Sequence, residues 1–228
     1  MVLLDPGDEV LLPAPYWVSY SAIATLAEAT SIIIPSSIET DFKITPEQLE
    51  AFITPKTKLV MFNSPNNPSG TIYTEAEYRA LGKVLEKYPN IFILSDEIYE
   101  HINYGTEHFS IAAIPELYDR TITVNGVAKA FAMTGWRIGY IAFNNSPQLD
   151  NIRENLPKLA RVRISTNLPV QYAALESLRG SQNYINDFVS EMKKHRDLVV
   201  RRLNEMPGLS CSNPKGAFYA FPKIEDNK

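Results

Sequence analysis

Short apolar runs alternate with stretches of helical hydrophobic spacing along most of the chain. Apolar runs that are bounded by turn residues are typical of buried strands. Capping boxes at 45–48 and 74–77 predict helices that reach about Phe52 and Tyr88. Strands are predicted at residues 9–12, 30–35, 58–62, 91–94, 121–124 and 138–142, and a further helix at 19–28. Because strands alternating with helices build parallel sheets, we predict an α/β protein with a three-layer α/β/α fold and a mostly parallel sheet.

The pattern changes in the C-terminal part of the chain. Helices are predicted at residues 147–159, with an interruption at Pro157, at 169–178 and at 182–205. The last of these is amphipathic and long enough to connect two domains. Runs at 209–211 and 217–221 then predict strands of a smaller α+β unit. We therefore predict a partial large domain over residues 1–180, followed by an interdomain helix and the start of a small domain over residues 181–228.

Composition and charge favour small-molecule chemistry. The 228 residues carry a formal net charge of -4, without the long runs of one charge that nucleic-acid or membrane-surface binding requires. No apolar stretch reaches the length of a membrane span. Cys211 is the only cysteine, which excludes an internal disulfide and favours a reducing compartment such as the cytoplasm. His101, His108 and His195 lack metal-ligand spacing, so no metal site is predicted.

Three polar motifs follow predicted strands directly. They lie at residues 63–70, at 95–100 and around Lys129, in the loop that leads to Trp136 and Arg137. The carboxyl ends of parallel strands form the edge where ligands bind in open α/β sheets. A single lysine is usually a solvated surface cation, but one that shares this edge with two other polar motifs is a candidate for chemistry.

The spacing of Asn67, Asp96, Tyr99, Lys129 and Arg137 resembles that of the fold-type I aminotransferases, which use pyridoxal 5'-phosphate (PLP). The segment 128–137, Ala-Lys-Ala-Phe-Ala-Met-Thr-Gly-Trp-Arg, is similar to the lysine signature of that family. The resemblance implies a homodimeric transaminase that moves an amino group from an L-amino acid to 2-oxoglutarate in ping-pong half-reactions. The segments 125–129 and 213–219 resemble the aspartate and alanine branches, which favours those two donors.

The resemblance also implies roles for the two central residues. The Lys129 amine condenses with the cofactor aldehyde, and once freed by substrate it moves a proton between the substrate α-carbon and the cofactor. Asp96 pairs with the pyridine nitrogen and keeps it protonated, so that the ring accepts electrons. An acid at a strand end that caps a helix is the structural alternative for Asp96.

Four further residues complete the implied cofactor site. Tyr99 and Asn67 bind the phenolic oxygen of PLP, Trp17 stacks on the pyridine ring, and Arg137 binds the phosphate through its guanidinium fork. Their structural alternatives are a packed tyrosine, a turn asparagine, a core tryptophan and a solvated arginine.

The sequence departs from the family pattern in two ways. Ala128 and Gly126 stand where many members place hydroxyl residues for the phosphate, which shifts phosphate binding toward Arg137. Relatives are also expected to extend beyond both ends of this chain, with a phosphate loop upstream and the arginine for the substrate α-carboxylate downstream.

Two alternative functions remain open from the sequence. A β-lyase on the same scaffold differs in that its keto-acid formation does not depend on 2-oxoglutarate. A non-enzymatic regulator with an aminotransferase-like effector domain carries a basic winged-helix segment ahead of that domain. The sequence upstream of the chain distinguishes this last alternative.

Overall fold

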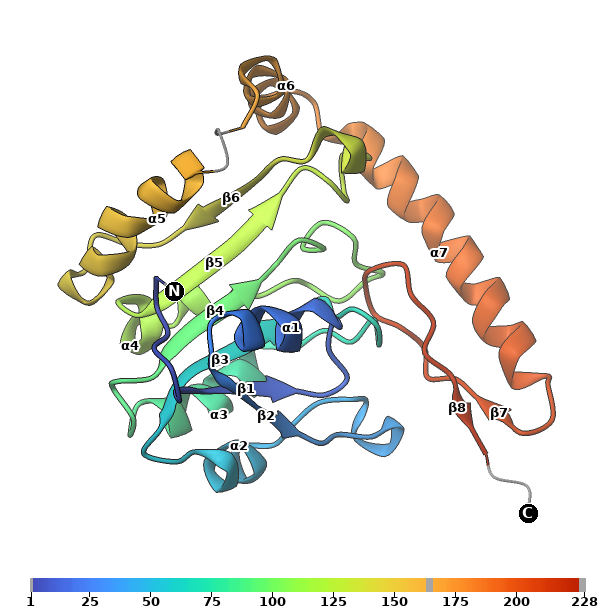
Figure 1. Ribbon diagram of the computed structural model, residues 1–228. Helices are drawn as coiled ribbons and strands as arrows, with labels where there is room; N and C mark the ends of the chain where they lie inside the picture. The colour runs from blue at the N-terminus through green and yellow to red at the C-terminus, as the bar shows by residue number, and fades with distance from the viewer. Residues whose placement is uncertain (1, 163–165, 226–228) are drawn as a thin grey trace.

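The computed structural model describes residues 2–162 and 166–225, and a six-stranded sheet forms its centre (Figure 1). The strands are β1 (Glu9–Pro13), β2 (Thr30–Ile34), β3 (Thr57–Asn63), β4 (Phe92–Asp96), β5 (Thr121–Gly126) and β6 (Gly139–Ala142). Their order is β2-β1-β3-β4-β5-β6. All neighbouring pairs are parallel except β5 and β6. The predicted mostly parallel sheet is confirmed.

Helices cover both faces of the sheet. The helices that pack on it are α1 (Ser19–Leu26), α2 (Pro46–Phe52), α3 (Glu75–Leu85), α4 (Pro115–Tyr118) and α5 (Asp150–Val162), and α6 (Leu168–Arg179) and α7 (Asn183–Asn204) follow them in the chain. Successive strand side chains point to opposite faces, so Val60 of β3 packs in one core with α2, α3 and α4. Its neighbour Leu59 packs in a second core with α1. This arrangement confirms the three-layer α/β/α fold.

The two capping boxes form as predicted. Thr45 Oγ1 accepts the Gln48 backbone N–H at 3.2 Å, while Gln48 Oε1 accepts the Thr45 N–H at 2.9 Å. Thr74 and Glu77 make the same reciprocal pair, at 3.3 and 2.7 Å. Each box satisfies two backbone donors that a helix start leaves free. The helix that begins after Thr74 ends at Leu85, three residues before the predicted end at Tyr88.

The predicted interruption at Pro157 is wrong, because α5 continues through it. Proline removes only one helical hydrogen bond. Ile152 is buried and Leu156 is partly buried against the sheet, so packing of this one face on the sheet stabilises the turns that precede Pro157.

The predicted strand at 217–221 is also wrong. Ala217 adopts a left-handed φ of 55° after Gly216 forms a β-bridge with Asn103, and this bend is incompatible with an extended strand. The strand forms later, as β8 (Lys223–Ile224), and pairs with β7 (Leu209–Ser210). Figure 1 shows α7 running from the end of α6 down to this pair, away from the sheet. The domain boundary at residue 180 stays a prediction.

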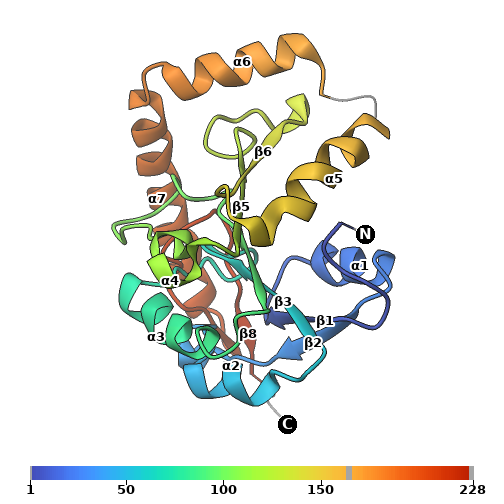
Figure 2. The same cartoon turned by 90° about the vertical axis from the view of Figure 1, so that its left-hand side faces the viewer.

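β6 and the two helices that follow it enclose a groove. Figure 2 shows α5 and α6 standing beside β6. Side chains of all three elements line a groove of about 830 Å³. No helix in the described part of the chain is long and apolar enough to cross a membrane.

Candidate active site

The carboxyl ends of β3 and β4 are joined by side-chain hydrogen bonds. Asn63 lies opposite Asp96 in the parallel register. Asn63 Nδ2 donates to the Asp96 carbonyl at 2.9 Å, and Asn63 Oδ1 accepts the Asn67 backbone N–H at 2.8 Å. The last residue of one strand therefore fixes the start of the loop that carries Asn67 against the end of the next strand.

The Asp96 carboxylate is held by groups from two elements. Tyr20 Oη, on α1, donates to Asp96 Oδ2 at 2.6 Å, and the Ile98 backbone N–H donates to Oδ1 at 3.2 Å. Burial raises the pKa of Asp96, while these two hydrogen bonds and the Lys129 amine act in the opposite direction. Trp17 packs edge-on against Tyr20, with ring centroids 5.5 Å apart, and is 42% exposed. Trp17 thus contacts the same tyrosine that donates to Asp96.

Lys129 lies in the turn that follows β5. The buried side chains of Ala130 and Phe131 anchor this turn. Lys129 Nζ lies 5.6 Å from the centroid of the Tyr99 ring and 5.7 Å from that of Phe218. Aromatic rings attract an ammonium group at this distance. The two rings therefore hold the amine near the carboxyl ends of the strands.

Tyr99 and Asn67 converge on one oxygen atom, the hydroxyl of Tyr219. Tyr99 Oη lies 2.6 Å from Tyr219 Oη, and Asn67 Nδ2 donates to Tyr219 Oη at 3.2 Å. Burial, followed by the Tyr219 hydroxyl, raises the pKa of Tyr99. Tyr99 therefore remains a neutral phenol that can donate a hydrogen bond.

The structure does not bring Arg137 into contact with the other candidates among the described residues. Its side chain is exposed, and Nη1 donates to the Thr134 carbonyl at 2.9 Å. Arg137 lines the groove between β6 and α6 together with Trp136 and Tyr140. Its role as the phosphate ligand stays a prediction.

The glycine at position 126 has a packing reason. A Cβ atom there would lie 2.9 Å from Gly139 Cα and 3.0 Å from the Ile138 carbonyl oxygen. Because Gly126 lies directly opposite Gly139 in the antiparallel pair, any side chain at this position would force the backbone of β6 to shift.

The family model for aminotransferase class I and II matches residues 1–228. The chain belongs to this aminotransferase family. A similar curated protein is the aspartate/prephenate aminotransferase of Cereibacter sphaeroides, which is 48% identical over 97% of this chain and 55% of its own length. The aspartate aminotransferase of Rhizobium meliloti strain 1021 is 44% identical over 97% of this chain and 53% of its own length.

Solved aminotransferase structures have the same fold. The crystal structure of the Rhizobium meliloti aspartate aminotransferase has a TM-score of 0.92 at 43% identity, covering 97% of this chain and 55% of that one. The alanine aminotransferase of Pyrococcus furiosus has a TM-score of 0.93 at 35% identity, covering 100% and 57%. This aminotransferase chain therefore spans about half the length of the relatives that it matches.

Three further candidate site residues of this aminotransferase chain, Tyr20, Phe218 and Tyr219, became apparent only in the structure. Tyr20, which binds Asp96, lies three positions after Trp17, and its place at a helix start near an aromatic candidate was a usable signal. Phe218 and Tyr219 belong to a segment recognised only for its branch resemblance. They lie beside Tyr99 because of the tertiary fold.

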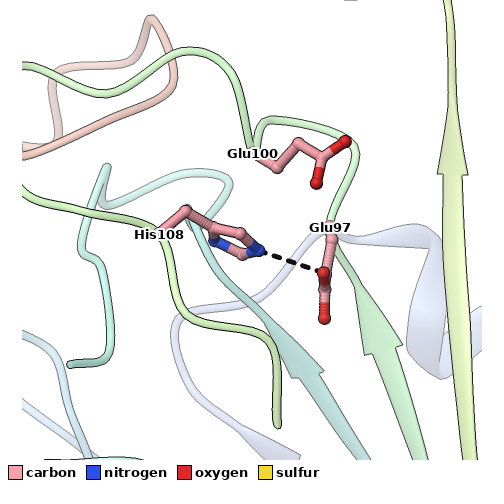
Figure 3. Close-up of side chains that lie close together, drawn as sticks. All are labelled: Glu97, Glu100 and His108. Carbon is pink, nitrogen blue, oxygen red and sulfur yellow. Dashed lines mark hydrogen bonds and ion pairs between the residues drawn. The ribbon is translucent and has the colours of Figure 1, made fainter. Parts of the chain in front are cut away.

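The loop that follows β4 contributes to a second polar cluster, which consists of Glu97, Glu100 and His108 (Figure 3). Ligand atoms of Glu97, Glu100 and His108 lie within 4.8 Å of one another. The buried Glu97 carboxylate is already bound by the hydroxyls of Ser95 at 2.8 Å and Ser110 at 2.6 Å, and His108 Nε2 lies 3.0 Å from it. These bonds tie the segment that carries His108 and Ser110 to the carboxyl end of β4.

Proposed function

We propose that the complete protein is a PLP-dependent transaminase that moves an amino group from an L-amino acid to 2-oxoglutarate. The observation that carries this proposal is the position of the Lys129 amine, within 5.6 and 5.7 Å of the Tyr99 and Phe218 ring centroids and close enough to the buried Asp96 carboxylate to lower its pKa. Family membership supports the same chemistry. When bound, PLP supplies an aldehyde for the lysine amine and a ring that accepts an electron pair.

The residues at the sheet edge fit that cofactor. Tyr99 and Asn67 already converge on a phenolic oxygen, which is the group that PLP carries at its 3-position. Asp96 offers a carboxylate for a pyridine nitrogen, and Trp17 offers a partly exposed ring beside it. We propose Lys129 as the catalytic residue and Arg137 as the phosphate ligand. The arrangement of the donors supports the role of Lys129, and the guanidinium fork of Arg137, which binds phosphate oxygens in pairs, supports the second role.

Asp96 and Lys129 divide the proton chemistry between them. Burial favours the neutral carboxyl of Asp96, whereas hydrogen bonds from Tyr20 and Ile98 and the nearby amine favour the carboxylate. An ionised Asp96 holds a proton on the ring nitrogen. Lys129, on a turn anchored in the core, is positioned to move a proton to and from the substrate α-carbon.

We further propose aspartate or alanine as the amino donor. Curated relatives carry the names aspartate aminotransferase and aspartate/prephenate aminotransferase, and a structural relative is an alanine aminotransferase. We place the protein in the cytoplasm, on the support of its single cysteine.

A homodimer is proposed for the complete protein. Large apolar side chains are exposed on and around α5 and α6, namely Leu159, Val162, Leu168, Tyr172, Leu175 and Leu178. Exposed apolar patches of this kind mark contact surfaces. Sedimentation of the complete protein as a monomer at micromolar concentration would contradict this part of the proposal.

The experiment that tests the function is covalent labelling. Borohydride reduction of the complete protein with PLP should leave the cofactor mass on the peptide that contains Lys129, because, among the lysines that the structure describes, Lys129 is the one whose charge acts on Asp96. Lys158, a surface lysine on α5, is the internal control and should remain unlabelled. Labelling of another lysine refutes the assignment. Keto-acid formation without 2-oxoglutarate would instead identify a β-lyase.

A further inference from the structure

Tyr219 reaches the candidate active site from the C-terminal part of the chain. Its hydroxyl lies between Tyr99 and Asn67, at 2.6 and 3.2 Å. These are the two side chains proposed above for the phenolic oxygen of PLP. A phenolic oxygen of the protein thus occupies the position between them, and the phenol of tyrosine and the 3-hydroxyl of PLP are the same chemical group.

The Tyr219 hydroxyl and the 3-hydroxyl of PLP cannot both bind Tyr99 and Asn67 at the same time. Either hydroxyl of the Tyr99–Tyr219 pair can be the donor, but the Tyr219 oxygen already occupies the place that a second phenolic oxygen needs to bond both Tyr99 and Asn67. Buried polar groups that lose a partner are costly, so the buried Tyr99 hydroxyl needs an oxygen partner both with and without the cofactor. Tyr219 supplies that oxygen in the structure described here.

The backbone that precedes Tyr219 is anchored independently of the Tyr219 side chain, whose ring packs against Tyr99 and Phe218. The preceding residues are fixed, because the Lys215 and Gly216 N–H groups donate to the Gly70 carbonyl at 2.8 and 2.9 Å, and the Ala217 N–H donates to the Ile102 carbonyl at 2.8 Å. Residues 219–222 form no helix or strand. Rotation of Tyr219 therefore breaks none of these anchoring bonds.

We propose that the Tyr219 hydroxyl competes with PLP for Tyr99 and Asn67. It stabilises the site in the absence of cofactor and moves away when PLP binds. Tyr219 is thus a residue that sets cofactor affinity from the C-terminal unit of the chain. This inference rests on the proposed PLP-dependent function.

The test compares Tyr219→Phe with Tyr104→Phe in the complete protein. PLP affinity is measured by absorbance titration, and the melting temperature is measured with and without PLP. Tyr219→Phe removes a hydrogen bond only from the PLP-free state, so the Kd for PLP should fall by about threefold to tenfold. The melting temperature should fall only in the absence of PLP.

Tyr104→Phe is the matched control. The Tyr104 hydroxyl donates to the Ala217 carbonyl, which holds the same loop outside the cofactor site. This variant should lower the melting temperature equally with and without PLP and leave the Kd unchanged. An unchanged or increased Kd for Tyr219→Phe, in a protein whose wild type binds PLP, overturns the inference alone. A wild type that fails to bind PLP refutes the proposed function, and the inference with it.

Discussion

The hydrogen bond from Tyr20 to Asp96 should control the lower end of the pH range for activity. Tyr20 is 5% exposed, and its hydroxyl lies 2.6 Å from Asp96 Oδ2. The bond stabilises the ionised carboxylate and so opposes the rise in pKa that burial causes. Tyr20→Phe removes this stabilisation, and the pKa of Asp96 should rise further. Less carboxylate is then ionised at any given acidic pH.

The size of the effect follows from the type of bond. A hydrogen bond to a charged group contributes about 1.5 kcal/mol or more, and about 1.4 kcal/mol corresponds to a tenfold change in an equilibrium constant. Protonation of Asp96 should therefore become roughly tenfold more favourable. The acidic limb of the pH profile should move to higher pH by about one unit, with the rate at alkaline pH almost preserved.

The assay is the half-reaction of the PLP-loaded complete protein with aspartate or alanine, followed by absorbance across the pH range. Tyr118→Phe is the control, because Tyr118 is exposed on α4, away from the site. An acidic limb that stays in place in Tyr20→Phe, with normal melting behaviour, would show that this hydrogen bond does not set the ionisation of Asp96. A uniform loss of rate at every pH would indicate a role in positioning alone.

Three further predictions concern the site and the fold. Asp96→Ala should still allow covalent attachment of PLP to Lys129 but slow the half-reaction on the order of 100-fold or more, and near-normal rates would refute its role. Arg120 is 4% exposed and donates to three carbonyls at 2.7–2.8 Å near the end of α3, so Arg120→Met should lower the free energy of unfolding in urea by about 3 kcal/mol. Arg79→Met, at an exposed position, should lower the free energy of unfolding by less than about 0.5 kcal/mol. Equal losses for Arg120→Met and Arg79→Met would contradict this prediction. Residues 1–228 expressed alone should aggregate and show no transamination, because apolar side chains of α5 and α6 are exposed; turnover equal to that of the complete protein would contradict this.

Local sequence signals predicted those parts of the fold that depend on local physics. The capping boxes at Thr45 and Thr74 need only residues three positions apart, and both formed. The end of α3 and the continuity of α5 through Pro157 depend on packing against the sheet. The predicted end at Tyr88 and the predicted interruption at Pro157 were therefore wrong. The predicted strand at 217–221 failed because Gly216 pairs with Asn103, more than a hundred positions away in the sequence.

The candidate site divides in the same way. The sequence by itself determined that polar motifs follow β3, β4 and β5, and that Asn67, Asp96 and Lys129 belong to one family pattern, because strand ends and motif spacing are local properties. Only the tertiary structure decided that Tyr20 binds Asp96 across 76 positions and that Tyr219 reaches Asn67 across 152. Those contacts depend on where α1 and the C-terminal loop pack, and packing is set by the whole fold rather than by any stretch of sequence.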